Sequence, residues 1–235
     1  MDYTYADIAK MIDHSLLNPV LTDRELEAGC RLAREYDVAS ACVKPYYLKR
    51  CAALLTGSMV AASTVIGFPH GGHKTAVKLA EAEQALADGG AELDMVVNVG
   101  KVLSEDWEYV SREVRAVVEI THHRGAIVKV IFENCYLRDM HKIRLCEICA
   151  EAGADFVKTS TGYGSGGATL DDLKLMRRHS PPHVRVKAAG GVRTLDGLLE
   201  VRAIGVARSG ATRTAEMLDE CRRRLEVPVS AGGRI

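Results

Sequence analysis

Short apolar runs alternate with longer amphipathic segments along almost the whole chain, and a glycine marks many of the junctions. Four junctions share one pattern: an amphipathic segment ends at a glycine, a small residue follows, and a run rich in β-branched residues begins. The four glycines are Gly90, Gly125, Gly153 and Gly205. Glycine commonly occupies the left-handed position that ends a helix. These junctions therefore predict helices that each lead directly into a strand.

The amphipathic segments predict seven helices, two of which open with a capping box, Thr22-x-x-Glu25 and Thr169-x-x-Asp172. The predicted helices span residues 22–36, 74–88, 104–123, 138–152, 169–179, 194–203 and 213–225. The apolar runs predict eight strands, over residues 11–13, 40–43, 60–66, 93–98, 128–132, 156–159, 184–188 and 206–208.

Strands that read as continuous apolar runs, with helices between them, are typical of a parallel sheet whose outer face is covered by helices. Eight β/α units in 235 residues favour an α/β fold, a closed (β/α)8 TIM barrel that forms a single domain over residues 1–235. An open doubly wound sheet is the alternative. It is disfavoured because no G-x-G-x-x-G follows the first strand and because polar residues end nearly every strand.

The charge balance of the chain argues against a polyanionic partner. Lys plus Arg and Asp plus Glu number 31 each, so no net field draws the chain to nucleic acid or to an anionic membrane. The first 15 residues carry acids and no apolar signal segment, and the run 59–68 is too short to span a bilayer. We therefore expect a soluble, unexported protein that acts on a small molecule.

Cysteine and histidine spacing gives little support for a metal site. The seven cysteines show no regular disulfide spacing, which indicates reduced thiols in a cytoplasm. Cys146 and Cys149 form a C-x-x-C inside a helical pattern, and we interpret them as packed helix residues. His70 and His73 have a metal-like spacing but lack further ligands in register. No metal is expected.

Two lysines end apolar runs that are each followed by a glycine-bearing loop, Lys158 in GADFVKTSTG and Lys187 in VRVKAAGGVR. Burying an ammonium group among apolar residues is costly, so such positions suggest function. Asp94 likewise interrupts the apolar run AELDMVV. In a barrel the carboxyl ends of all strands meet at one mouth, which predicts a shared pocket for these three side chains.

A lysine becomes a nucleophile when its pKa falls, and both burial and a second nearby ammonium lower it. We expect Lys158 and Lys187 on strands separated by one other strand, close enough for one to depress the pKa of the other. Asp94 between them could hold a water or shuttle a proton. The alternative is structural: each lysine forms a plain salt bridge with a carboxylate such as Asp94 or Glu133.

Glycine-rich segments after the seventh and eighth strands indicate a phosphate site. Gly190 and Gly191 follow the seventh predicted strand, and the segment from Ser209 to Thr212 follows the eighth and leads into a helix. Backbone N–H groups at a helix N-terminus bind phosphate, and barrels commonly use these two loops for it. A phosphorylated substrate is therefore predicted.

These strings together resemble the class I deoxyribose-phosphate aldolases. The resemblance runs through MIDHSLL, ACVKP, TVIGFPHG, ELDMVVNVG, VKVIFENC, GADFVKTSTG, VKAAGGVR and the SGATRT region, which is nearly the whole chain. It implies a TIM barrel that cleaves 2-deoxy-D-ribose 5-phosphate to D-glyceraldehyde 3-phosphate and acetaldehyde without a metal or organic cofactor. It also implies Lys158 as the Schiff-base lysine, Lys187 as the lysine that tunes it, and Asp94 as the acid/base partner.

The resemblance further implies which residues contact the substrate. The expected substrate-binding residues are Asp13, Ser15, Cys42, Thr159, Gly162, Gly190, Gly191, Gly210, Thr212 and Arg213. Two positions depart from the family: Tyr163 stands where some members have a phosphate-binding lysine, and Arg213 stands where many have a serine and could supply the missing charge. The tail EVPVSAGGRI lacks the tyrosine that certain members use in proton transfer.

Two other functions remain open from the sequence. One is a different class I Schiff-base aldolase or transaldolase that acts on another phosphosugar, and the other is a phosphosugar-binding barrel without turnover. We expect small-molecule phosphosugar and aldehyde substrates, no nucleic-acid or membrane partner, and a homo-oligomer, with a dimer favoured.

Overall fold

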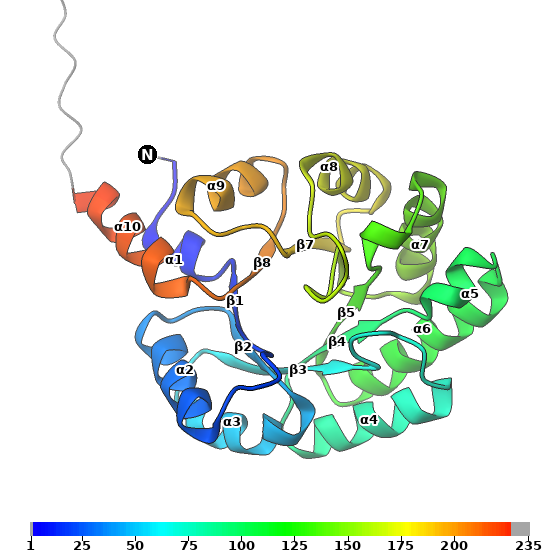
Figure 1. Ribbon diagram of the computed structural model, residues 1–235, viewed down its shortest axis with the longest axis horizontal. Coiled ribbons are helices and arrows are strands. Elements are labelled where there is room, and N and C mark those ends of the chain that lie inside the picture. The colour runs from blue at the N-terminus through cyan, green and yellow to red at the C-terminus, as the bar shows by residue number, and fades with distance from the viewer. Residues whose placement is uncertain (1, 227–235) are drawn as a thin grey trace, which may run out of the picture.

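The computed structural model describes residues 2–226 and contains a closed barrel of eight parallel strands surrounded by helices (Figure 1). Each strand pairs with its sequence neighbours, and β1 pairs with β8 to close the ring. The predicted barrel is therefore confirmed. The prediction about the C-terminal tail concerns residues 227–235, which lie outside the described part of the chain. The strands are β1 (Ile12–Leu16), β2 (Ser40–Val43), β3 (Ala61–Ile66), β4 (Glu92–Val96), β5 (Ile127–Ile131), β6 (Phe156–Lys158), β7 (Arg185–Ala189) and β8 (Arg208–Ala211).

All seven predicted helices are present within a residue or two at most ends, but the structure contains others as well. The α-helices are α1 (Tyr5–Ala9), α2 (Asp23–Glu35), α3 (Leu48–Leu55), α4 (Thr75–Ala87), α5 (Val99–Leu103), α6 (Trp107–His123), α7 (Asp139–Ala152), α8 (Leu170–His179), α9 (Leu195–Ala203) and α10 (Thr214–Glu226), with 3-10 turns at Pro45–Tyr47 and Asn134–Tyr136. Helix α3 escaped prediction because it follows a 3-10 turn directly and has no side-chain N-cap.

The helix-to-strand joints form largely as the glycines predict. Gly125, Gly153 and Gly205 have φ angles of 69°, 77° and 93°, in the left-handed region. At the fourth joint the positive φ falls on Gly89 rather than on Gly90. A Cβ at Gly90 would lie 2.9 Å from the carbonyl oxygen of Ala85, so this glycine allows close packing on the end of α4.

Strand β8 begins later than predicted, at Arg208 instead of residue 206, and it ends at Ala211. Ser209 and Gly210 therefore belong to the strand, not to the loop after it, and only Thr212 and Arg213 separate β8 from α10. The sequence RSGA lacks β-branched and aromatic residues, so its propensity gave no strand signal. Pairing with β1 and β7 on either side fixes it as a strand.

The strands have two chemically different faces. Outward-facing residues such as Ile12, Leu93, Val128 and Val186 join the main hydrophobic core between the sheet and the helices. The inward-facing residues of several strands are charged instead. TIM barrels usually fill the interior with branched apolar side chains, so a charged interior points to function.

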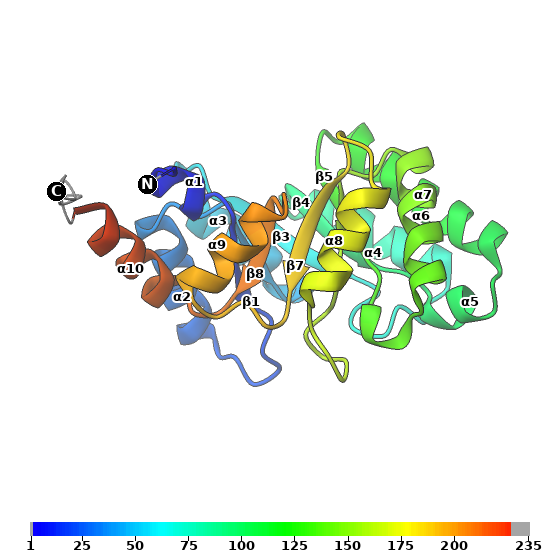
Figure 2. The ribbon, with the colours of Figure 1, turned by 90° about the horizontal axis from the view of Figure 1, so that it is seen from above.

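The loops after the strands gather at one end of the barrel, which we call the mouth. In Figure 2 the loop after β1 (blue) and the loop after β6 (yellow-green) extend from the same end. Side chains at the carboxyl ends of the strands therefore converge there. Within residues 2–226, no helix combines the length and the apolar character needed to cross a bilayer.

Candidate active site

Two lysines stand side by side near the mouth of the barrel. Lys158 is the last residue of β6, Lys187 lies in β7, and the two are direct partners in the parallel ladder. The expectation that one strand separates them is wrong, because β6 and β7 are adjacent. Partners on neighbouring strands project from the same face of the sheet, so both amines enter the barrel interior.

A single carboxylate joins the two amines. Asp94 in β4 is 0% exposed, and its Oδ2 accepts hydrogen bonds from Lys158 Nζ at 2.7 Å and from Lys187 Nζ at 2.8 Å. The Oδ1 of Asp94 accepts another from Lys129 Nζ at 2.8 Å. Burial acts to raise the pKa of Asp94, but the three lysines hold that pKa well below its usual value. Asp94 is therefore an anion shared by both predicted catalytic lysines.

The pKa values of the two lysines move in opposite directions. Burial lowers the pKa of Lys158; Asp94 opposes this shift and Lys187 adds to it, and the pKa remains below its ordinary value. Burial also acts to lower the pKa of Lys187, but Asp13, 2.5 Å from its Nζ, and Asp94 raise that pKa above its ordinary value. Lys158 is therefore the amine that more readily gives up its proton.

A third buried lysine, Lys129 of β5, was not selected from the sequence. Its Nζ lies 2.6 Å from Glu92, 2.8 Å from Asp94 and 3.3 Å from Asp13. Burial acts to lower its pKa, but these carboxylates hold that pKa well above its ordinary value. Lys129 carries the same sequence signal as Lys158, a lysine inside an apolar run, IVKVI, and that signal could have identified it.

Arg208 of β8 completes the network. Its Nη1 lies 2.6 Å from Asp13 Oδ1, and its Nη2 lies 3.2 Å from Glu92 Oε1. Asp13 thereby contacts three cations, which hold its pKa below the usual value although burial acts to raise it. The ion pairs link four cations, Lys129, Lys158, Lys187 and Arg208, to three carboxylates, Asp13, Glu92 and Asp94.

A cavity of about 460 Å³ opens above this network at the mouth. The residues predicted from the sequence that line it are Asp13, Ser15, Cys42, Lys158, Gly162, Lys187, Gly190, Gly191, Gly210 and Thr212. Asp94 lies outside the lining but is hydrogen-bonded to two residues that line it, Lys158 and Lys187. Thr159 is also outside the lining, because it is fully buried and its Oγ1 bonds to the backbone of Ala189 at 3.3 Å.

The loops after β6 and β7 bring backbone close to the cavity. Gly162, Gly190 and Gly191 have φ angles of 88°, 73° and 112°, which other residues rarely adopt. A Cβ at Gly167 would lie 2.3 Å from the carbonyl oxygen of Gly190, so the two loops pack backbone to backbone. Turns of this kind expose N–H groups of the main chain, as phosphate-binding loops do.

The arginine that lines the cavity is Arg193, whereas the sequence analysis selected Arg213. Arg213 lies outside the lining, and its guanidinium pairs with Glu216 at 3.4 Å. Arg193, on the loop after β7, lines the cavity and has no ion-pair partner among residues 2–226. It follows the Gly190-Gly191 pair after one intervening residue, Val192, in AAGGVR, a position that could have drawn attention to it.

Glu133 and Tyr163 shape the loop after β6. Glu133 does not pair with the lysines; its carboxylate accepts hydrogen bonds from the backbone N–H of Thr161, at 3.1 Å, and from the Thr161 hydroxyl. Thr161 Oγ1 in turn accepts one from Tyr163 N at 3.0 Å. The Tyr163 hydroxyl donates to the carbonyl oxygen of Leu17 at 2.8 Å, so this loop spans from β5 to the loop after β1.

The cysteines and histidines considered from the sequence take no part in this ion-pair network. Cys42 lines the cavity, and burial raises the pKa of its thiol, so it remains protonated. Cys146 and Cys149 are buried free thiols in α7, which confirms them as packed helix residues. His70 and His73 are exposed on the loop before α4. Within residues 2–226, no three His, Cys, Asp or Glu side chains cluster in the manner of a metal site.

Comparison with known proteins gives consistent matches along the chain. A curated protein from Rhodopirellula baltica named deoxyribose-phosphate aldolase is 65% identical over 227 residues, which is 97% of this chain and 94% of that protein. A solved structure described as a putative deoxyribose-phosphate aldolase from Coccidioides immitis superposes with a TM-score of 0.90 at 35% identity, covering 94% of this chain and 87% of the other.

A second solved structure, described as the unique tetrameric structure of deoxyribose phosphate aldolase from Aeropyrum pernix, superposes with a TM-score of 0.86 at 32% identity, covering 93% of this chain and 92% of the other. Residues 8–212 match the DeoC/LacD family of aldolases. Since that match extends over most of its length, the chain belongs to the DeoC/LacD aldolase family.

Proposed function

We propose that the chain reversibly cleaves 2-deoxy-D-ribose 5-phosphate to D-glyceraldehyde 3-phosphate and acetaldehyde through a lysine Schiff base, in the catabolism of deoxyribonucleotides. One observation carries the proposal: Lys158 combines a lowered pKa, a place in the cavity lining, and a hydrogen bond to a carboxylate oxygen that Lys187 also contacts. An amine with a lowered pKa, lining a cavity of about 460 Å³, suits imine formation with a sugar aldehyde, because its neutral form is the nucleophile.

The proposed reaction uses this arrangement as follows. Neutral Lys158 Nζ attacks C1 of the open-chain sugar, and loss of water leaves an iminium ion. A water held by Asp94 and Lys187 removes the proton of the C3 hydroxyl, and the C2–C3 bond breaks, with its electron pair passing into an enamine. Release of D-glyceraldehyde 3-phosphate, protonation of the enamine at C2 and hydrolysis by water then free acetaldehyde and the amine.

The polar cavity divides into a sugar end and a phosphate end in this proposal. Asp13 and Ser15 line it beside the lysines and would bind the sugar hydroxyl directly or through water. The N–H groups around Gly162, Gly190 and Gly191, with Thr212, would bind the phosphate, and Arg193 rather than Arg213 would balance its charge.

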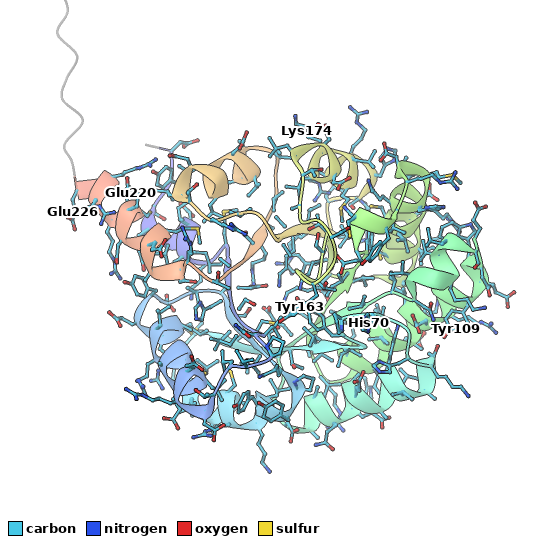
Figure 3. All side chains as sticks on the ribbon, viewed as in Figure 1. His70, Tyr109, Tyr163, Lys174, Glu220 and Glu226 are labelled. Atoms are coloured by element: carbon cyan, nitrogen blue, oxygen red, sulfur yellow. The ribbon has the colours of Figure 1, made fainter. Side chains whose placement is uncertain are left out.

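Trapping of the imine tests the chemistry. Borohydride reduction in the presence of acetaldehyde should add about 28 Da, an ethyl group, at Lys158 and nowhere else in stoichiometric yield. Lys158→Ala should remove the adduct, whereas Lys174→Ala should leave it, because Lys174 is exposed on α8 far from the mouth (Figure 3). An unchanged yield in Lys158→Ala would contradict the mechanism. Cleavage of deoxyribose 5-phosphate against other phosphosugars then tests the substrate.

We also propose that residues 1–235 act as one domain, in a cytoplasm, as a homo-oligomer with a dimer favoured. The seven cysteines are free thiols, which supports a reducing compartment. The relative from Aeropyrum pernix is described as tetrameric, which supports association but not a particular number of subunits. Sedimentation equilibrium of the full chain would determine that number.

A further inference from the structure

A second cavity, of about 400 Å³, lies beside the first at the mouth. The two cavities share three lining residues, Leu17, Pro19 and Tyr163. The rest of the second lining is dominated by apolar and aromatic side chains, among them Val65 and Phe68. The barrel mouth therefore holds two neighbouring spaces of different chemistry, one polar and cationic and one apolar.

The two charged residues in the second lining are already engaged. Lys44 Nζ donates to three backbone carbonyl oxygens of the loop after β1, at 3.0, 3.1 and 3.3 Å. Glu81 accepts a hydrogen bond from the backbone N–H of Gly67 at 2.8 Å. A charged ligand would have to compete with these backbone hydrogen bonds to pair with Lys44 or Glu81, whereas an alkyl chain would leave them intact.

Tyr163 forms the wall between the two cavities. Its hydroxyl reaches Leu17 O at 2.8 Å, and its ring packs edge-on against Phe68 at 5.4 Å between centroids. Its backbone N–H donates a hydrogen bond to Thr161 Oγ1, and the backbone N–H of Thr161 donates to Glu133. The side chain itself is 45% exposed, and Figure 3 shows it near the centre of the ring of strands. Its truncation should thus change the wall without removing a core residue.

The floor under this wall is apolar and continuous. Leu17, Cys42 and Val65 form a small hydrophobic cluster separate from the main core, and Phe68 packs on it. Cys42 lines the first cavity and Val65 the second. If Tyr163 were replaced by a smaller residue, a ligand's alkyl chain could therefore pass from the first cavity to the second along hydrophobic surface.

We propose that the second cavity is a subsite for the alkyl chain of a neutral acceptor aldehyde, and that Tyr163 limits access to it. This inference rests on the proposed function, run in the direction of synthesis. The enamine carbon formed from acetaldehyde on Lys158 attacks the acceptor carbonyl carbon, and a C–C bond forms. The carbonyl oxygen takes up a proton and becomes a hydroxyl, and water hydrolyses the iminium to release the product aldehyde and the amine.

The test compares two acceptors that differ by three methylenes, propanal and hexanal, with acetaldehyde as donor. Each methylene buried is worth about fourfold in binding. Tyr163→Ala should raise the hexanal-to-propanal ratio of kcat/KM by about tenfold or more over the parent chain. Tyr163→Phe keeps the ring and loses only the hydrogen bond to Leu17, so its ratio should stay within about threefold of the parent. Tyr163→Leu gives a second shortened wall.

A further substitution asks whether the alkyl chain occupies the second cavity. Tyr46 lines only that cavity and is 69% exposed, so Tyr46→Asp places a charge in its lining at little cost to folding. Added to Tyr163→Ala, it should return the ratio toward the parent value. An unchanged ratio in both shortened variants, or loss of all turnover in both, would overturn the inference. Absence of cleavage of deoxyribose 5-phosphate by the parent chain would instead overturn the proposed function.

Discussion

The barrel interior and the layer between the strands and the helices both bury a lysine whose pKa is lowered, yet only one of these lysines faces a cavity. Lys78 of α4 is 0% exposed; its Nζ donates to Glu113 of α6 and to the carbonyl oxygen of Val96, both at 2.8 Å. Burial lowers its pKa in spite of Glu113, just as burial lowers that of Lys158. A lowered pKa therefore does not by itself mark a catalytic amine.

The two lysines differ in their access to a cavity and in whether a second lysine shares their carboxylate. Among residues 2–226, Lys78 is the only cation that pairs with Glu113, and its side chain is fully buried, so it ties α4 to α6 and to the end of β4. Lys158 shares one oxygen of Asp94 with Lys187 and lines the polar cavity. We expect changes in the barrel interior to affect turnover, and changes to polar pairs in the outer layer to affect stability.

The largest effect should come from Lys158→Met, which removes the proposed nucleophile from the interior. Cleavage of deoxyribose 5-phosphate should fall by a factor of about 10⁴ or more, the scale at which removal of a nucleophile acts. The comparison would fail if the variant unfolded, so the free energy of unfolding from urea titration should accompany the rate. Retention of more than a tenth of the parent rate would contradict the role of Lys158.

Lys78→Met should act on stability instead. Removing one partner of a buried ion pair leaves Glu113 unpaired and should lower the free energy of unfolding by about 3–5 kcal/mol in urea titration. The double variant Lys78→Met/Glu113→Leu should recover most of this loss, because both charges are gone. The kcat of the folded fraction should stay within about twofold of the parent; a large fall in kcat would break the distinction between the two regions.

His14 offers a smaller and pH-dependent test of the outer layer. It lies on the outward face of β1, its Nδ1 is 2.8 Å from Thr214 Oγ1, and burial lowers its pKa to about 4. Because the unfolded state binds the proton with a pKa near 6.5, the neutral histidine's stabilising effect is complete above that pH and is lost as pH falls toward 4. The loss approaches about 3 kcal/mol.

His14→Gln is the matched control, since the amide keeps a hydrogen-bonding group and cannot titrate. Chemical denaturation at several pH values between 4 and 7 should show a steeper decline for the parent than for this variant. Equal slopes would mean that His14 does not supply the dependence. Turnover of the folded variant at pH 7 should be unaffected, as expected for a residue on the outer face.

The smallest predicted effect is a shift in a pH profile, which is measured separately from the fall in kcat that loss of the water-binding Lys187 should also cause. Lys187 is a weaker influence on the pKa of Lys158 than burial or Asp94, but it acts in the lowering direction. Lys187→Met should therefore raise the pKa of Lys158 and move the acid limb of kcat/KM to higher pH, since the amine must be neutral to attack. Lys187→Arg keeps the charge and should leave the limb nearer the parent position. A limb that moved to lower pH in the methionine variant would contradict the assignment.

Much of the fold was predictable because its signals are local. Capping boxes, glycine ends and apolar runs each depend on a few neighbouring residues, and they located seven helices and the barrel. Helix α3 and strand β8 were harder, because α3 lacks a capping side chain and the segment RSGA is fixed only by its neighbours β1 and β7. Long-range pairing decides such segments, and a single sequence does not display it.

The site, like the fold, contains some residues that local sequence patterns identify and others that only long-range contacts identify. Lys158, Lys187 and Asp94 stand out because each interrupts an apolar run, and the structure brings all three into contact. The pairing of Arg208 with Asp13 and Glu92 joins strands that are distant in sequence, so no local pattern announces it. The choice between Arg193 and Arg213 likewise depends on which loop folds over the cavity.

The count of charges in the barrel interior has a consequence for the resting enzyme. With all four cations protonated the enclosed network carries one unit of excess positive charge, and a medium of low polarity favours electroneutrality. Deprotonation of Lys158 brings the sum to zero, so the free amine required for attack is also the electrically balanced state. In the proposed reaction, iminium formation on Lys158 would restore the positive unit next to Asp94, where the neighbouring anion is already in place.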